Sequence, residues 1–220
     1  MKKIGVLLSG CGVFDGSEIN EAVLSVYFLE KNGAEVLFLA PDKEQLHVVN
    51  HLTEQVLENE SRNILLESAR IARGKIKNVK DVDVAELDGL VIPGGFGAAK
   101  NLCTFALDGP DCKIDEDVKK LILNIVNVHK PLCAICISPV LVAKALEGSG
   151  RRVTLTIGND KNVAQAIEKM GAVHTNASVS EFVCDKENKI VTTPAYMLGQ
   201  SVIDVAEGIS KAIKEFMNLI

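Results

Sequence analysis

One cysteine, Cys136, stands where a nucleophile is expected, between a short apolar run and a helix start. Leu132 to Ile135 is continuously apolar and follows a proline, which is typical of a strand buried on both faces of a parallel sheet. Ser138 and Pro139 indicate a helix start, because proline suits the first helical turn, where its missing N–H costs nothing. A thiol at such a turn projects above the sheet edge, and the N–H groups of a helix N-terminus favour its thiolate. We therefore predict that Cys136 is a nucleophile in preference to a structural cysteine.

Cys133 and Cys136 also form a Cys-x-x-Cys pattern, which would suit a redox pair. If Cys133 lies inside the strand, the two Cα atoms are roughly 10 Å apart and the side chains point to opposite faces of the sheet, beyond disulfide reach. We therefore interpret Cys133 as a packing residue.

Two carboxylates, Glu18 and Glu21, begin a helix predicted from about residue 18 to 32, with Ser17 as its N-cap and Gly33 at its end. Acids at a helix N-terminus are commonly explained by favourable charge alone. This helix starts at the sheet edge that should carry Cys136, so one of the two could face the thiol. The residues alone leave that choice open.

Glycine-rich segments follow two predicted strands, at Ser9 to Gly16 and at Pro93 to Asn101. Ligands of open α/β sheets bind at the carboxyl ends of the strands, and glycine lets the backbone approach a ligand. A role in turns alone is the alternative. The glycine spacing in the first segment does not match a dinucleotide fingerprint, and His47 to His51 lacks the glutamate of a zinc protease, so we expect no cofactor and no metal.

The composition indicates a single domain over residues 1–220, because 220 residues with 47% hydrophobic content can bury a sizeable core. A net charge of -5 without a basic cluster argues against a nucleic-acid or membrane partner. The apolar stretch after Lys3 stops at Ser9, too short for a signal peptide or a membrane span. Six scattered cysteines favour reduced thiols and a cytoplasmic location.

Apolar periodicity predicts alternating strands and helices. Strands are expected at residues 4–8, 35–40, 87–92, 132–135 and 153–157, with a hairpin formed by 182–184 and 190–193. Helices are expected at residues 18–32, 61–73, 115–129, 139–147, 160–170 and 200–219. This alternation predicts an α/β fold, a flavodoxin-like three-layer sandwich with a mainly parallel central sheet.

Several motifs resemble those of a known family. Pro93-Gly94-Gly95 at a strand end, with Ala134 to Pro139 downstream, resembles the ThiJ/PfpI superfamily of class I glutamine amidotransferase-like domains. Ser9 to Val13, Pro93 to Asn101 and Thr192 to Met197 are similar, more narrowly, to its enhancing-lycopene-biosynthesis (ElbB) branch. The resemblance covers essentially the whole chain.

The resemblance implies a nucleophilic Cys136 and a helix-borne glutamate that hydrogen-bonds it, which Glu21 matches. It also implies an oxyanion pocket made by the backbone N–H groups of Gly95 and Ile137. Members that resemble this branch are described as glyoxalases, which convert glyoxal to glycolate without glutathione. A homodimer and a link to isoprenoid biosynthesis are further expectations from the resemblance.

The chain departs from the family pattern at the third catalytic position. Protease-like members have histidine directly after the cysteine, where this chain has Ile137, and other relatives have a histidine where this chain has Thr154 and Thr156. No amidotransferase-type histidine follows, so hydrolysis of peptides or of glutamine is poorly supported. His174 is the only histidine after Cys136 and is a further candidate for the site.

The sequence therefore leads to two main hypotheses. The first is a cofactor-independent, glyoxalase-like lyase in which the Cys136 thiolate adds to a small dicarbonyl. The alternative is a non-catalytic cysteine redox sensor or accessory protein of isoprenoid metabolism, because an exposed thiolate oxidises readily whether or not it turns over a substrate. A glutamine amidotransferase, the third reading, would have to release ammonia from glutamine.

Overall fold

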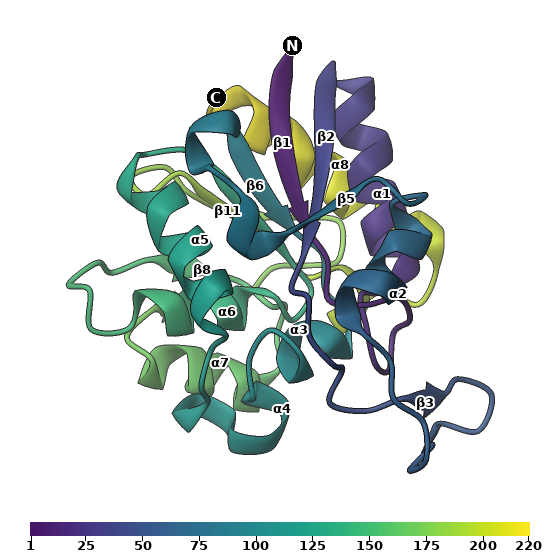
Figure 1. Cartoon of the computed structure of the whole chain (residues 1–220). Helices are drawn as coiled ribbons and strands as arrows, with labels where there is room; N and C mark the ends of the chain where they lie inside the picture. Colours follow the sequence, from purple (N-terminus) through teal and green to yellow (C-terminus); the bar gives the residue numbers. More distant parts are fainter.

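Seven strands form one sheet in the order β10-β11-β7-β6-β1-β2-β5 (Figure 1). The computed structural model describes all residues from 1 to 220. Six strands are mutually parallel: β1 (Lys2–Leu7), β2 (Ala34–Ala40), β5 (Ile76–Asn78), β6 (Gly89–Ile92), β7 (Leu132–Ile135) and β11 (Ile190–Thr193). Only β10 (Val183–Asp185) is antiparallel, in the predicted hairpin with β11. The prediction of a mainly parallel, flavodoxin-like α/β fold is confirmed.

Helices cover both faces of this sheet (Figure 1). One face carries α1 (Ile19–Lys31) and α8 (Val202–Asn218), which pack against each other, and the opposite face carries α5 (Glu116–Asn127), α6 (Pro139–Leu146) and α7 (Lys161–Lys169). α2 (Ile64–Ile71) lies beside β2 and β5. Each face has its own apolar cluster, and consecutive residues of β7 alternate between the two. This two-sided burial is why the strand is apolar throughout.

Short elements complete the chain. β3 (Val49–Asn50) and β4 (Gln55–Val56) form a hairpin, and β8 (Thr154–Leu155) pairs with β9 (Val173–His174). The helices α3 (Phe96–Lys100) and α4 (Phe105–Asp108) are each about one turn long. Four 3-10 turns are η1 (Val79–Asp81), η2 (Val84–Glu86), η3 (Gly109–Asp111) and η4 (Ala195–Met197).

The strand predicted at residues 153–157 is wrong in length, because only Thr154 and Leu155 are strand and they pair outside the main sheet. Its N–H groups are taken by side chains of the neighbouring hairpin: that of Thr154 donates to the Asp185 carboxylate and that of Thr156 to the Thr192 hydroxyl. Side-chain acceptors therefore replace the backbone ladder that would have extended the sheet.

None of the helices has the length and the apolar character that a membrane span requires.

The carboxyl ends of β1, β6, β7 and β11 meet at one edge of the sheet, because these four strands are parallel neighbours. The loops that leave them, at residues 8–17, 93–95, 136–138 and 194–197, are thereby brought together from four separate parts of the chain.

Candidate active site

Cys136 occupies the predicted turn between a strand and a helix. β7 ends at Ile135 and α6 begins at Pro139, and the backbone of Cys136 has a φ of 63°. This left-handed conformation is uncommon for a residue with a side chain and is found at nucleophile turns. The turn is held because the Cys136 N–H donates to the Thr193 carbonyl at 2.9 Å and the Ser138 hydroxyl donates to the Pro93 carbonyl at 2.7 Å.

Glu21 is the carboxylate that the fold brings to this thiol. Its side chain is fully buried in the first turn of α1 and is hydrogen-bonded with the Cys136 sulfur. The Gly94 N–H donates to its Oε2 at 2.8 Å and the Tyr196 N–H donates to its Oε1 at 3.2 Å. Three loops therefore hold one carboxyl group in one orientation.

Gly94 makes room for this pair. A Cβ atom at position 94 would lie 2.5 Å from the Cys136 Cβ and 2.7 Å from the Glu21 Oε2, closer than real contacts allow. The glycine that follows a strand in the Pro-Gly-Gly motif is therefore required by the packing of the thiol against the carboxyl group.

Glu18 has a different task from Glu21. It is the N-cap of α1, and its Oε2 accepts the Glu21 N–H at 2.6 Å. The prediction that Ser17 caps this helix is wrong, because the Ser17 hydroxyl instead accepts the N–H of Ser9 at 2.9 Å and closes the loop after β1. The carboxylate of Glu18 thus orients the helix turn that carries Glu21.

Two backbone N–H groups, those of Gly95 and Ile137, donate to the Cys136 sulfur. Neither N–H has a backbone carbonyl as acceptor. Gly95 has a φ of 98°, and a Cβ there would lie 2.4 Å from the backbone of Gly16, so only glycine fits. Two N–H groups that converge on a nucleophile and are not used in backbone hydrogen bonds have the arrangement of an oxyanion hole.

The glycine-rich loops of the sequence form one continuous wall at this edge. The Phe96 N–H donates to the Val13 carbonyl at 2.7 Å. The buried Asn101 amide donates to the carbonyls of Ser9 and Asp15, each at 2.8 Å. The loop after β1 is therefore bound to the loop after β6, and both border the thiol.

The protonation of the pair is set by burial and by mutual charge. Burial raises the pKa of Glu21 to about 7, and the Glu18 charge adds to this effect, while the N–H groups of Tyr196 and Gly94 oppose it. Burial also raises the pKa of the Cys136 thiol, the Glu21 charge adds to this rise, and the N–H groups of Gly95 and Ile137 oppose it. The N-terminus of α6 is therefore not sufficient to lower the pKa of the Cys136 thiol, contrary to the sequence prediction. The pair gives up one proton near neutral pH and resists losing the second.

A cavity of about 480 Å³ opens in front of Cys136. Most of its lining is apolar, and its only charged side chains are Glu18 and Asp160. The lining residues are Val13, Glu18, Gly95, Phe96, Ala99, Phe105, Ala106, Cys136, Ile137, Asp160, Val163, Tyr196 and Met197.

The structure does not bring His174 to this cavity. Its ring lies on β9, where Nε2 accepts the Ile157 N–H at 3.3 Å, and no histidine is among the lining residues. Conversely, Phe105 and Asp160 line the cavity without having been predicted. Asp160 stands at the start of the helix predicted at residues 160–170 and caps it, and Phe105 lies outside every predicted strand and helix.

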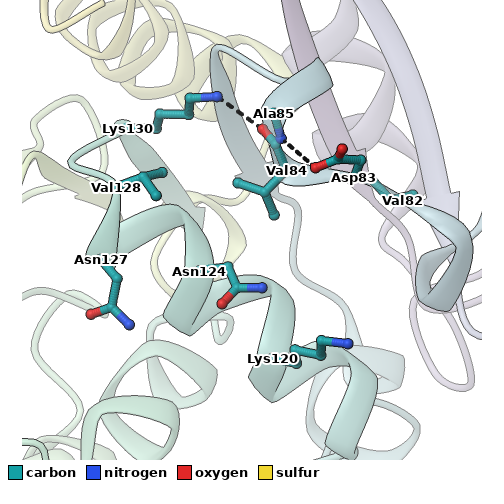
Figure 2. A pocket seen from close by; sticks show the side chains of 9 residues that line it. All are labelled: Val82, Asp83, Val84, Ala85, Lys120, Asn124, Asn127, Val128 and Lys130. Carbon is teal, nitrogen blue, oxygen red and sulfur yellow. Dashed lines mark hydrogen bonds between the residues drawn. The ribbon is translucent and has the colours of Figure 1, made fainter.

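A second hollow of about 550 Å³ lies between η2 and α5 (Figure 2). Two hydrogen bonds join residues that line it. The Lys130 ammonium donates to the Val84 carbonyl at 2.9 Å, and the Ala85 N–H donates to the Asp83 carboxylate at 2.8 Å. It contains no cysteine, histidine or buried acid, so we assign the chemistry to the smaller cavity at Cys136.

Cys133 is fully buried, and burial raises the pKa of its thiol. Both Cys133 and Cys136 are free thiols and belong to the apolar cluster on the α1 and α8 face. The expectation that they point to opposite faces is wrong, because the positive φ of Cys136 turns its side chain away from the alternation of the strand. Cys133 nevertheless packs in the core, as expected.

The raised pKa of Glu21 predicts that the stability of the protein falls as the pH rises from about 4.5 to about 7. In this window the folded state binds more protons than the unfolded state, so deprotonation opposes folding by about 3 kcal/mol in total. Glu21→Gln should remove this part of the pH dependence, measured as the free energy of unfolding in urea at several pH values. Glu30→Gln, at an exposed site on the same helix, is the matched control. Parallel profiles for wild type and Glu21→Gln would contradict the buried, titrating carboxyl.

Comparisons with known proteins identify the family of this chain. A family model described as the DJ-1/PfpI family matches residues 10–197. The rat "ES1 protein homolog, mitochondrial" is 42% identical over 99% of this chain and 84% of its own length. The crystal structure of an "isoprenoid biosynthesis protein with amidotransferase-like domain" from Ehrlichia chaffeensis is 38% identical, with a TM-score of 0.91 over 99% of this chain and 100% of that one.

A glyoxalase III from Candida albicans shares the fold. Its TM-score is 0.66 over 100% of this chain and 97% of that one, at 15% sequence identity. At this identity the similarity speaks for the fold alone.

The prediction of a cytoplasmic location is wrong by comparison with relatives. The rat, human and zebrafish relatives are all named as mitochondrial proteins. Scattered free cysteines favour a reducing compartment but do not distinguish the cytosol from other reducing compartments, which is why the composition misled.

Proposed function

This chain belongs to the DJ-1/PfpI family, in its ElbB branch, and from that premise we propose that it is a cofactor-independent, glyoxalase-like enzyme. It would convert glyoxal, or a related small dicarbonyl, to the hydroxy acid through Cys136. The observation that carries the proposal is the buried carboxyl of Glu21 beside a thiol that two backbone N–H groups also contact. We further propose that residues 1–220 act as one amidotransferase-like domain, because β1 and β11, from opposite ends of the chain, share a sheet.

The first step forms a carbon–sulfur bond. The thiol proton passes to the Glu21 carboxylate, and the Cys136 sulfur adds to one aldehyde carbon. The carbonyl oxygen becomes an oxyanion beside the N–H groups of Gly95 and Ile137, and Glu21 then returns a proton to it, which gives a neutral hemithioacetal. A pKa of about 7 suits Glu21 to both directions of proton transfer at neutral pH.

The second step moves hydrogen between the two carbons. The Glu21 carboxylate removes the C–H proton of the hemithioacetal carbon, and the electron pair forms an enediol with the neighbouring carbonyl. The hydroxyl proton of the sulfur-bearing carbon passes to the oxygen of the second carbon, and Glu21 returns its proton to the second carbon, which gives a hydroxyacyl thioester on Cys136. Water then cleaves the thioester and releases the hydroxy acid and the free thiol, so the net reaction adds one water and needs no external oxidant.

The size and the lining of the cavity indicate which class of substrate it would accept. At about 480 Å³ it is much larger than a two-carbon dicarbonyl, its walls are mainly apolar, and its charged groups are two carboxylates. Such a site favours uncharged dicarbonyls with an apolar substituent over anionic ones, because an anion would be desolvated beside like charge. The isoprenoid-biosynthesis name of the Ehrlichia relative is consistent with an apolar substrate and motivates the proposed link to isoprenoid metabolism.

The proposal is tested by the product. Purified protein is incubated with glyoxal and with dicarbonyls that carry a methyl or phenyl group, and the hydroxy acid is followed by NMR beside Cys136→Ala. The acid itself must be observed, because every free thiol consumes aldehydes. Failure to form any acid above the level of the variant would reject the enzyme.

The alternative function is a non-catalytic redox sensor or accessory protein of isoprenoid metabolism. One observation favours it: no histidine lines the cavity, so all proton transfer would fall to Glu21. Mass spectrometry after mild peroxide distinguishes the two, since oxidation of Cys136 before the other cysteines, without dicarbonyl turnover, is expected only of a sensor.

We predict a homodimer formed through an apolar stripe on α1. Ile19, Val23 and Tyr27 follow one another at a spacing of four residues and are 44%, 52% and 54% exposed. A continuous exposed stripe of this kind is typical of an interface. Light scattering at micromolar concentration should give twice the 23.7 kDa of one chain, and Val23→Glu should give the single-chain mass. A monomeric wild type would contradict the prediction.

A further inference from the structure

Two further cysteines, Cys103 and Cys112, contact each other away from the candidate active site. The two thiols are close enough to shift each other's pKa, the Cys103 thiol donates to the Ala98 carbonyl at 3.5 Å, and both side chains are buried, with 4% and 2% exposed. They belong to the same apolar cluster on the α5 and α6 face, and both are free. Neither takes part in the chemistry proposed for Cys136.

Backbone hydrogen bonds join the two ends of the segment that contains the two cysteines. The Thr104 N–H donates to the Lys113 carbonyl at 2.9 Å, and the Asp115 N–H donates to the Leu102 carbonyl at 2.9 Å. The two arms of this loop therefore run side by side, with Cys103 opposite Ile114, so that Cys112 lies two residues from the position paired with Cys103. This loop consists of α4 and η3, each about one turn long, so it has little internal structure of its own.

The loop is also a wall of the cavity at Cys136. Phe105 and Ala106, in α4, line that cavity, and Cys103 borders a separate small hollow of about 220 Å³ on the other side. Lys43, Lys100 and Lys113 line this hollow together with one acid, Asp115, which is paired with the Lys43 ammonium at 2.6 Å, so the lining keeps a net positive charge. An anionic small disulfide would be attracted to such a surface.

We propose that Cys103 and Cys112 are a redox site that forms a reversible intramolecular disulfide by exchange with a small disulfide such as oxidised glutathione. The Cys112 thiolate attacks one sulfur of the oxidant, forms a mixed disulfide and releases one glutathione thiolate. Cys103, after losing its proton to solvent, attacks the Cys112 sulfur and releases the second glutathione. Two protein thiols are oxidised and one disulfide is reduced to two thiols, so the electrons balance.

The surroundings of Cys112 suit it to the first attack. The neighbouring Cys103 thiol and the charge of Lys144 lower the pKa of the Cys112 thiol, against the effect of burial. The Lys144 ammonium is fixed near the loop because it donates to the Pro110 carbonyl at 3.0 Å. Because both thiols are covered, the exchange requires the short loop to open locally, which one-turn elements with exposed residues at 106–108 allow.

The chain offers a direct assay. Trypsin cleaves after Lys100 and Lys113, and no lysine or arginine lies between them, so both cysteines fall in the single peptide 101–113. The full-length protein is incubated with oxidised glutathione and its remaining thiols are alkylated. After digestion with trypsin, the mass of the peptide is measured by mass spectrometry. We expect this peptide to lose two hydrogen atoms and to escape alkylation, and to recover both thiols after dithiothreitol.

Single-cysteine variants, a thermal melt and amide exchange test the disulfide independently. Cys103→Ser and Cys112→Ser should each abolish the loss of two hydrogens. Cys184, half-buried on β10, is the internal control, since it should form only a mixed disulfide with glutathione. Oxidised wild type should melt roughly 5 °C higher than reduced wild type and show slower amide exchange at residues 104–111, because the cross-link closes the loop. A peptide 101–113 that keeps two alkylatable thiols while Cys184 is modified would overturn the proposal, whether or not the protein is a glyoxalase.

Discussion

Cys136→Ala is expected to lower the rate of hydroxy acid formation from glyoxal by a factor of at least about 10³, with the fold intact. The substitution removes the atom that bonds to substrate, and no other thiol lines the cavity. It should cost little stability, because the side chain is small, lies at the cavity surface with 7% exposed, and loses only one sulfur atom. The measurement is the initial rate of acid formation by NMR, beside a thermal melt of both proteins.

Cys133→Ser is the matched control for this result. It lies three residues away and is fully buried within β7, so its hydroxyl would sit in an apolar core and cost about 1–3 kcal/mol of stability. We therefore expect the two variants to separate: Cys136→Ala loses turnover and keeps its melting temperature, whereas Cys133→Ser does the reverse. Acid formation by Cys136→Ala at the wild-type rate would remove Cys136 from the mechanism.

Glu21→Gln is expected to lower turnover by about 10²- to 10⁴-fold, the range typical of a lost general acid–base group. The amide still fills the buried site and can donate a hydrogen bond to the sulfur, but it cannot accept or return a proton. One of the two N–H groups that now bond the carboxylate, from Gly94 or Tyr196, would face the amide NH₂ group, so the fold is checked by circular dichroism. Glu21→Asp, with a side chain one methylene shorter, should weaken both contacts.

Glu21→Gln should make the Cys136 thiol more reactive although it lowers turnover. The Glu21 charge raises the pKa of Cys136, so its removal should lower that pKa and let alkylation of Cys136 begin at a lower pH. A thiol that reacts faster while turnover falls would separate proton transfer from nucleophile activation. The measurement is the rate of iodoacetamide alkylation of Cys136 against pH, beside the rate with glyoxal.

Glu18→Gln is the matched control on the same helix turn. Its side-chain oxygen can still accept the Glu21 N–H, so the helix cap is kept and only the charge is lost. We expect turnover to change much less than in Glu21→Gln, with a modest fall in the pKa of Glu21, because the Glu18 charge raises that pKa. If Glu18→Gln abolishes turnover and Glu21→Gln does not, the roles of the two carboxylates are reversed.

Local sequence determined where several strands and helices begin and end. The strand at residues 132–135 has the predicted bounds, because a strand covered on both faces must be apolar at every position. The helices that begin at Pro139, Glu116 and Lys161 start within one residue of the predicted starts at 139, 115 and 160, since proline and capping aspartates act within one turn of the chain. The turn at Cys136 follows from the first two of these elements, so its position was predictable too.

Tertiary structure decided which side chains meet. Glu18 and Glu21 are equivalent as acids at a helix start, and only the N–H groups of Gly94 and Tyr196, from loops 73 and 175 residues away, select Glu21 for the thiol. The cavity wall at Phe105 and the proximity of Cys103 and Cys112 lie in a segment for which the sequence predicted neither a strand nor a helix. The physical reason is common to these cases: periodicity and capping report how one element is buried and where it ends, whereas contacts between elements depend on the order of the strands in the sheet.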